Sequence, residues 1–375
     1  MLTINAIRQT ARGTPIWQPG AINLHVSVPC PLKVRLKEAL GAFITDYNQR
    51  HERPLFCPSI LDGIPHGIDD LMQSSDNAQE LPDIWVSTGL HTAFSQPFKQ
   101  RFIDSGIYQG VTHPAALPLL PPELKAAVSK HNLGFLAFGF WQLVCDTSLC
   151  PDGPYPARWA DLLDPRYRQQ IAIHGCDGHV GGMTLAELLQ DQQGEQAVAA
   201  LAANIKAVRH FSQLIKGMNS ADPLRAPFNL MPGAAASQIP SSKRAALIEV
   251  EEGPLLAPML LYVKASLPQE DRQAVLAFLQ GETMRTILRA GDYHRATPLQ
   301  LPRMGQYCRR RLQPPQRSPK PAIYRRPGTG SDDDLMPAGL MPPANRATSL
   351  CSGFFKGFVN HGNSGDVHPA LTPLA

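Results

Sequence analysis

The chain has 375 residues, of which 43% are hydrophobic and 18% are charged. This length and composition suit a soluble globular protein with room for two cores, and no apolar run reaches the ~18 residues that a membrane span needs. The formal net charge is +4, but residues 302–375 carry ten Lys or Arg against four Asp. The rest of the chain is therefore close to neutral, which gives no case for nucleic-acid binding.

Residues 1–20 are interpreted as an N-terminal extension. They contain Arg8 and Arg12 but lack the continuous apolar segment of a signal peptide. We therefore expect the chain as written to reside in the cytoplasm, and in the periplasm if its true N-terminus is missing.

The first part of the chain alternates strands with helices. The predicted elements are strands at 22–28, 54–60 and 81–89, and helices at 33–49 and 68–73. In the longer helix, Leu36, Leu40, Phe43 and Tyr47 recur at helical spacing. The order βαβαβ predicts a parallel sheet with helices on both faces.

The second part continues in the same style after a proline-rich connection. The predicted elements are the connection at 114–122, strands at 133–144, 171–173, 245–250 and 255–264, helices at 159–163, 183–189, 194–209, from 266 and at 284–290, and a segment at 211–232 that is mostly loop. The helix at 194–209 is predicted from the stripe of Val198, Leu201, Ile205 and Val208.

Residues 158–189 combine a short helix, a buried strand, a glycine-rich loop and the start of a helix. The loop, 174–182, reads HGCDGHVGG. A strand, a glycine loop and a helix N-terminus together present backbone N–H groups to a ligand, although an unliganded turn has the same pattern.

This stretch, with its WADLLDPRYR segment, resembles the middle of type II periplasmic binding proteins, the solute-binding components of ABC transporters of the iron(III) and oxyanion class. The resemblance covers roughly residues 22–301. It implies an α/β fold of two lobes, each a mostly parallel sheet flanked by helices. It also implies a discontinuous first lobe (21–113 and 255–301), a second lobe (114–254) and a ligand cleft between them.

The same resemblance implies a monomer that binds a small molecule or ion, passes it to a transporter permease, and performs no catalysis. Residues 302–375 fall outside it. They are rich in proline and arginine and lack an apolar stripe, so they are predicted to be a disordered tail, either genuine or the product of a frame shift.

Four loops follow predicted strands, at the edge where ligands bind in open α/β sheets. The candidate ligand-binding residues on them are Ser27, Cys30, Thr88, Gly89, His91, Cys176, Asp177, Gly178, His179, Asn219 and Ser220. Hydroxyls, N–H groups and amides suit an anion, so no cofactor is required. Iron(III) binders of this class usually offer adjacent tyrosines, which this chain lacks, and Tyr155 and Tyr167 fall outside the predicted loops.

Two alternatives stay open at this point. Cys30, His91, Cys176 and His179 would suit a softer bound metal ion if they converged. Cys176 near His174 and His179 would suit a nucleophile with a base, but no Cys–His signature of a known enzyme accompanies it. The seven cysteines are odd in number and contain no CxxC, which favours neither a disulfide framework nor structural zinc.

Overall fold

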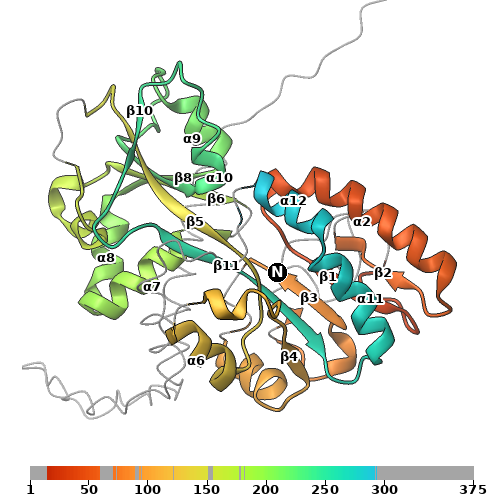
Figure 1. Cartoon of the computed structure of the whole chain (residues 1–375). Helices are drawn as coiled ribbons and strands as arrows, with labels where there is room; N and C mark the ends of the chain where they lie inside the picture. Colours follow the sequence, from red (N-terminus) through yellow and green to blue (C-terminus); the bar gives the residue numbers. More distant parts are fainter. Residues whose placement is uncertain are drawn as a thin grey trace, which may run out of the picture.

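The computed structural model describes residues 15–59, 71–72, 74–88, 93, 95–120, 122–150, 155–176, 179–180, 182–291 and 293. Within them the chain forms two α/β lobes joined by two long strands (Figure 1). The predicted tail at 302–375 and residues 1–14 lie outside the described residues. None of the helices in this part of the chain is both long and apolar enough to cross a membrane.

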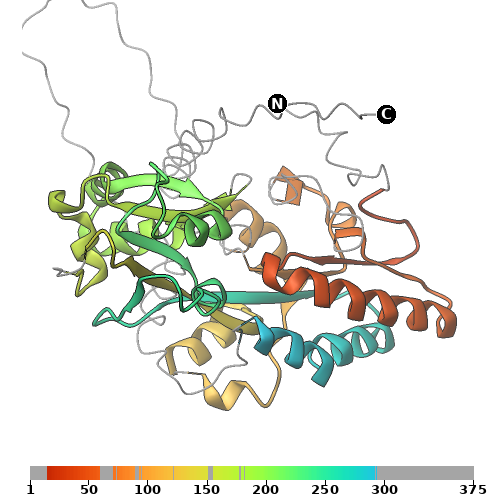
Figure 2. The same cartoon turned by 90° about the horizontal axis from the view of Figure 1, so that it is seen from above.

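The first lobe is built around three parallel strands. Strand β1 (Ile22–Val26) pairs in parallel with both β2 (Leu55–Phe56) and β3 (Ile84–Ser87). The other elements are α2 (Cys30–Arg50), η2 (Ala78–Glu80), α5 (Gln96–Phe98), the π-helical η3 (Lys99–Ile103), β4 (Tyr108–Gly110), η4 (Leu117–Leu119), α6 (Pro122–His131), α11 (Gln269–Leu279) and α12 (Glu282–Ala290). In Figure 2, α2, α11 and α12 lie together along one side of this lobe.

The second lobe repeats this plan. Strand β6 (Ile171–Cys176) pairs in parallel with β8 (Ile205–Arg209) and with β9 (Phe228–Pro232). The other elements are η5 (Trp159–Leu163), η6 (Pro165–Tyr167), β7 (His179–Val180), α7 (Gly182–Gln193), α8 (Gln196–Asn204), α9 (Phe211–Gly217), α10 (Gly233–Ala236) and β10 (Ala245–Ile248).

Two antiparallel strands pass from one lobe to the other. They are β5 (Phe135–Asp146) and β11 (Leu255–Lys264), which pair from Trp141↔Leu255 to Phe135↔Leu260. Beyond their common segment, β11 pairs with β3 and β4, whereas β5 pairs with β9 and β10. The strands form one continuous sheet in the order β2-β1-β3-β11-β5-β9-β6-β7, with a parallel group of strands in each lobe. With the flanking helices, this arrangement confirms the predicted two-lobed α/β fold class.

Strand alternation divides each lobe into two cores, one on each face of its sheet. In β3, Ile84 and Val86 pack under α2 and α11, while Trp85 packs on the other face with Tyr262. In β6, Ile171 and Ile173 face one cluster and Ala172 the other. The strands are buried on both faces, which explains their nearly continuous apolar sequences.

Three predicted elements are corrected. The helix predicted at 194–209 ends at Asn204, and Ile205–Arg209 is a strand. Asn204 donates hydrogen bonds to the carbonyls of Leu162 and Asp164, and Ile205 then pairs with Ile171. The sequence predicted a single helix because Val198 and Leu201 of α8 and Ile205 and Val208 of β8 happen to recur at helical spacing.

The segment at 211–232, predicted to be mostly loop, contains α9 and β9. The predicted glycine loop at 174–182 is also shorter, because β6 extends to Cys176 and turns back into β7, with Cys176 paired to His179. The lobe boundaries remain predictions. Ala116, Leu120 and Phe135 pack in the same cluster as Trp85, so the chain leaves the first lobe along β5.

Candidate functional site

The carboxyl ends of the parallel strands in the two lobes point toward each other. In the second lobe, β9 is antiparallel to β5, and its last residue, Pro232, pairs with Trp141, near where β5 enters from the first lobe. In the first lobe, the last residue of β3, Ser87, pairs with Leu260, on the side from which β11 arrives. Because ligands of open α/β sheets bind at the carboxyl ends of strands, the space between these ends is the candidate site.

A group of rings lies at the second-lobe side of this site. The His174 ring stacks on Trp141 at a centroid distance of 5.9 Å and lies 5.4 Å from His210 and 5.5 Å from Phe211. These four residues come from the middle of β5, the carboxyl half of β6 and the β8–α9 junction. They form a polar aromatic surface that we call the ring cluster.

The two histidines of the ring cluster are held differently. His210 is the N-cap of α9, where its Nδ1 accepts the backbone N–H of Ser212 at 3.3 Å. The side chain of Gln213 returns this contact by accepting the N–H of His210 at 3.2 Å. The sequence H-F-S-Q thus orients His210 by a capping arrangement rather than by packing.

His174 is neutral at physiological pH. Burial, reinforced by the neighbouring His210, lowers its pKa to about 4, while a backbone hydrogen bond at Arg209 acts in the opposite direction. Its Nδ1 is buried and has no hydrogen-bond partner among the residues that the structure describes. We infer that the other ring nitrogen, Nε2, donates to the Arg209 carbonyl. Nδ1 would then be a bare acceptor.

The first-lobe side consists of the segments after β1, β2 and β3. Ser27 donates its backbone N–H to the carbonyl of Val86 at 2.9 Å, which ties the first segment to the third. The Ser59 hydroxyl accepts the N–H of Val26 at 3.0 Å. Cys30 is the first residue of α2, and half-buried Thr88 directly follows β3. The structure therefore brings Ser27 and Thr88 to the same edge.

Gly89, His91, Asp177 and Gly178 lie outside the described residues. Cys176 and His179 face each other as backbone partners of the β6–β7 hairpin. Among the described residues, no group of three or more His, Cys, Asp or Glu side chains is placed to hold a metal ion.

Asn219 lies away from this site. Its side chain donates to Asp146 Oδ1 at 2.7 Å, and its side-chain oxygen accepts the backbone N–H of Arg244. Asp146 is the last residue of β5, at the end of the second lobe that is remote from the first. The side-chain amide of Asn219 thus makes its hydrogen bonds within the protein. Its position does not support the predicted contact with a ligand.

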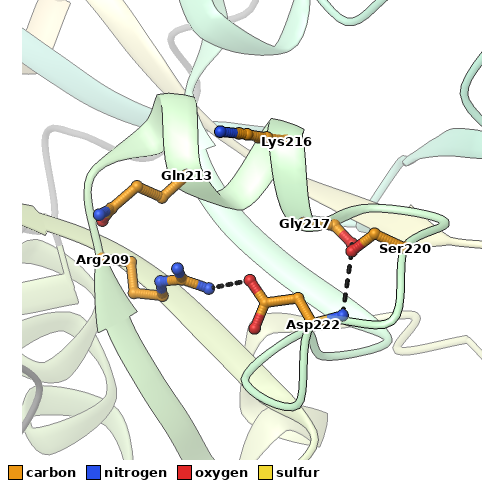
Figure 3. A pocket seen from close by; sticks show the side chains of 6 residues that line it. All are labelled: Arg209, Gln213, Lys216, Gly217, Ser220 and Asp222. Carbon is orange, nitrogen blue, oxygen red and sulfur yellow. Dashed lines mark hydrogen bonds and ion pairs between the residues drawn. The ribbon is translucent and has the colours of Figure 1, made fainter. Parts of the chain in front are cut away.

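Ser220 lines a pocket of about 350 Å³ on the side of α9 (Figure 3). The other lining residues are Arg209, Gln213, Lys216, Gly217 and Asp222. Arg209 pairs with Asp222 at 2.5 Å, and this hydrogen bond is the main cause that lowers the pKa of Asp222. The Ser220 hydroxyl donates to the Gly217 carbonyl at 2.6 Å and accepts the N–H of Asp222.

The two tyrosines considered for iron belong to other parts of the second lobe. Tyr167 is buried and makes an edge contact with Phe228, and the Tyr155 hydroxyl donates to the carbonyl of Cys150 at 3.1 Å. Phe228 is the first residue of β9 and pairs with Cys145, so both tyrosines lie toward the remote end of the lobe.

Sequence reasoning missed the ring cluster except for His174. Trp141 falls within the predicted strand at 133–144, and His210 falls between the predicted helix at 194–209 and the predicted loop at 211–232. The chain offers no clear signal here, because the capping-box pattern that marks a helix start has Ser, Thr, Asp or Asn at the N-cap, and this position is His210. Only the assignment of β8 as a strand would have placed His210 at a strand's carboxyl end.

Two lobes, two connecting strands and opposed strand ends define a two-lobed solute-binding protein. The sequence agrees: residues 79–306 match the model of the bacterial extracellular solute-binding protein family, and the chain belongs to that family. This confirms the resemblance drawn from the WADLLDPRYR segment. No curated protein matches the chain.

Solved structures with the same fold include apo ferric ion-binding protein A of Pasteurella haemolytica, which covers 77% of this chain and 89% of its own at 10% identity and a TM-score of 0.53. An ABC transporter protein from Clostridium perfringens covers 76% and 89% at 16% identity and a TM-score of 0.50. The periplasmic binding protein P5PA covers 74% and 87% at 13% identity and a TM-score of 0.50. At these identities the likeness establishes the fold.

Proposed function

We propose that this protein is the substrate-binding component of an ABC-type transport system and captures a small solute between its two lobes. The observation that carries the proposal is the opposition of strand ends: β3 and β9 end toward each other across β5 and β11. A solute held there contacts both lobes at once. Such a solute favours a closed arrangement because its contacts differ between the open and closed states.

The proposed ligand is a small anion, a metal ion or a metal chelate. On the second-lobe side, His174 and His210 supply imidazole nitrogens, while Trp141 and Phe211 supply apolar ring surface. Imidazole binds metals as a neutral ligand and anions as a hydrogen-bond donor. The first-lobe side would supply Ser27, Cys30, Thr88, Gly89 and His91, and the hairpin turn would supply Asp177 and Gly178.

Iron enters the proposal only through the ferric ion-binding protein that shares the fold. The positions of Tyr155 and Tyr167 do not favour a tyrosine-based iron site here. The sharpest first experiment is therefore elemental analysis combined with the native mass of protein purified without added ligand. An equimolar amount of metal would support a metal ion or a metal chelate as the ligand. An added organic mass without metal would support a small organic anion.

Two variants test the site, with a matched control. His210→Ala removes one imidazole of the ring cluster, and Gly178→Val blocks close backbone approach at the hairpin turn. The control, His51→Ala, removes a histidine at the carboxyl end of α2, the end opposite Cys30. His51 stacks there on Tyr47. Calorimetric titration with the solute found by native mass should show weaker binding for the first two variants only. Equal affinities in all three would contradict the proposed site.

The transport role predicts a membrane permease as partner and a monomer as the binding unit. The family acts outside the cell's cytoplasm, in contrast to the cytoplasmic location expected from residues 1–20. Fractionation of cells that express the native locus tests this point. Recovery of the protein in the periplasm supports transport, whereas recovery in the cytoplasm would favour a ligand sensor or carrier on the same fold.

A further inference from the structure

Two cysteines flank a tight turn at the remote end of the second lobe. Cys145 lies near the end of β5, and Cys150 follows five positions later. The turn is fixed by the N–H of Leu149, which donates to the Asp146 carbonyl at 3.0 Å, and by the N–H of Ser148, which donates to Asp146 Oδ1 at 3.1 Å. Cys145 and Cys150 lie immediately before and after this turn.

The two thiols belong to one buried environment. Cys145 is fully buried, and Cys150 packs against the same hydrophobic cluster. The Sγ atom of Cys145 lies 4.0 Å from the carbonyl oxygen of Cys150. Tyr155 closes this environment by donating its hydroxyl to the same carbonyl at 3.1 Å. Both cysteines have free thiols in this structure.

We propose that Cys145 and Cys150 form an intramolecular disulfide when the protein meets a disulfide oxidant, which makes this turn a redox-dependent crosslink. The turn between the two residues is already closed by hydrogen bonds, and the Cys145 sulfur already lies beside the backbone of Cys150. The crosslink involves none of the residues proposed to bind solute, so its test is independent of the proposed function.

The reaction follows thiol–disulfide exchange. The more accessible Cys150 thiolate attacks the oxidant and forms a mixed disulfide. Cys145 loses its proton and attacks the Cys150 sulfur, which forms the new S–S bond and releases the oxidant as thiol. Two thiols are oxidised, and one disulfide of the oxidant, such as glutathione disulfide, is reduced to two thiols. Burial, with smaller contributions from Cys150 and Asp146, raises the pKa of Cys145 to about 12. The second step is therefore slow in the folded protein and fast during folding.

The sequence allows a direct test by peptide mapping. No Lys or Arg lies between Lys130 and Arg158, so trypsin releases both cysteines on one peptide, 131–158. The full-length protein is refolded with glutathione disulfide, denatured, alkylated without reduction and digested. We expect this peptide to be unalkylated and about two mass units lighter than its reduced form. A further cut before Asp146 should leave two fragments joined only by the disulfide.

Alkylation of both residues, a stable glutathione adduct on either, or a link from Cys145 to another cysteine would overturn the proposal. A stability measurement supplies a second readout. The unmodified protein refolded under oxidising conditions should lose a few degrees of thermal midpoint on addition of reductant.

Cys150→Ser should abolish this response to reductant, because it removes the less buried partner. Cys57→Ala is the matched control, since Cys57 is a buried thiol of the first lobe, 3.5 Å from the Ser59 hydroxyl. It should keep the response. A response that persists in Cys150→Ser would contradict the crosslink.

Discussion

Gly139, in the strand β5 that joins the lobes, lies directly against the ring of Tyr293. A Cβ atom on Gly139 would approach ring atoms Cε1 and Cζ of Tyr293 at 2.7 Å, closer than carbon atoms pack. Tyr293 follows α12 and is buried in the first-lobe core. A residue beyond α12 thus rests on a connecting strand, and the absence of a side chain at Gly139 allows the contact.

This contact gives a prediction about stability. Gly139→Ala should lower the free energy of unfolding by ~1–3 kcal/mol, because it forces the Tyr293 ring away from β5. Tyr293→Leu should also destabilise, through a cavity. The double variant should lose less than the sum of the single losses, as urea denaturation of the three variants would show. Additive losses would mean that the two residues do not share this contact.

The ring cluster predicts a stability loss in mild acid. The folded-state pKa of His174 is about 4, below the 6.5 of an exposed histidine, so the unfolded state binds the proton more readily. Stability is therefore full above pH 6.5 and falls as the pH drops from 6.5 toward 4, by up to ~2–3 kcal/mol.

His174→Gln should flatten this pH dependence, and His51→Gln should leave it in place. Thermal midpoints across pH 4–8 measure the difference. If all three proteins show the same slope, His174 is not the residue responsible.

Asn219 predicts an effect on stability without an effect on binding. The backbone of Asn219 has a positive φ of 55°, a conformation that asparagine and glycine tolerate. Asn219→Gly keeps this backbone but leaves the buried carboxylate of Asp146 with one donor fewer, which should cost ~1–3 kcal/mol. Asn219→Ala should cost about 1 kcal/mol more because of backbone strain. Solute affinity should be unchanged in both; a weakened affinity would return Asn219 to the site.

A buried ion pair predicts unequal effects of its two halves. Lys264 Nζ donates to Asp83 Oδ1 at 3.1 Å and to the Leu81 carbonyl at 2.7 Å, and burial lowers the pKa of the lysine. Asp83→Ala leaves this ammonium buried and unpaired and also removes the acceptor of the Asn23 N–H, so it should cost ~3–5 kcal/mol.

Combining Asp83→Ala with Lys264→Met should recover part of that loss, because an apolar side chain of similar length replaces the stranded charge. Chemical denaturation of the single and double variants checks this. No recovery in the double variant would show that the Asn23 contact, rather than the charge, carries the cost.

Much of the fold follows from local pattern. Strand β11 occupies 255–264 as predicted, and α2 contains the whole predicted helix because its apolar residues recur at helical spacing. The family resemblance rested on the sequence around Trp159, and the match of residues 79–306 to the family model confirms it. Local pattern failed where a tertiary partner decides the structure. Ile205–Arg209 is a strand because β6 lies beside it, and no spacing within the segment contains that information.

The site was predictable only in part. The edges were anticipated, since Ser27 and Thr88 follow strands as expected. Which loop reaches which edge depends on strand direction across β5, and no local pattern shows that Asn219 contacts Asp146 at the end of β5. His210 escaped notice because it becomes a site residue only once β8 is known to be a strand.

The two connecting strands also bear on the order in which the protein matures. The second lobe is one continuous stretch between β5 and β11, whereas the first lobe needs β11, α11 and α12 to complete its sheet and cover it. During synthesis from the N-terminus, strands β1 to β3 are therefore covered on this face by α2 alone while the second lobe is made. The first lobe can be completed only after α12 has been synthesised.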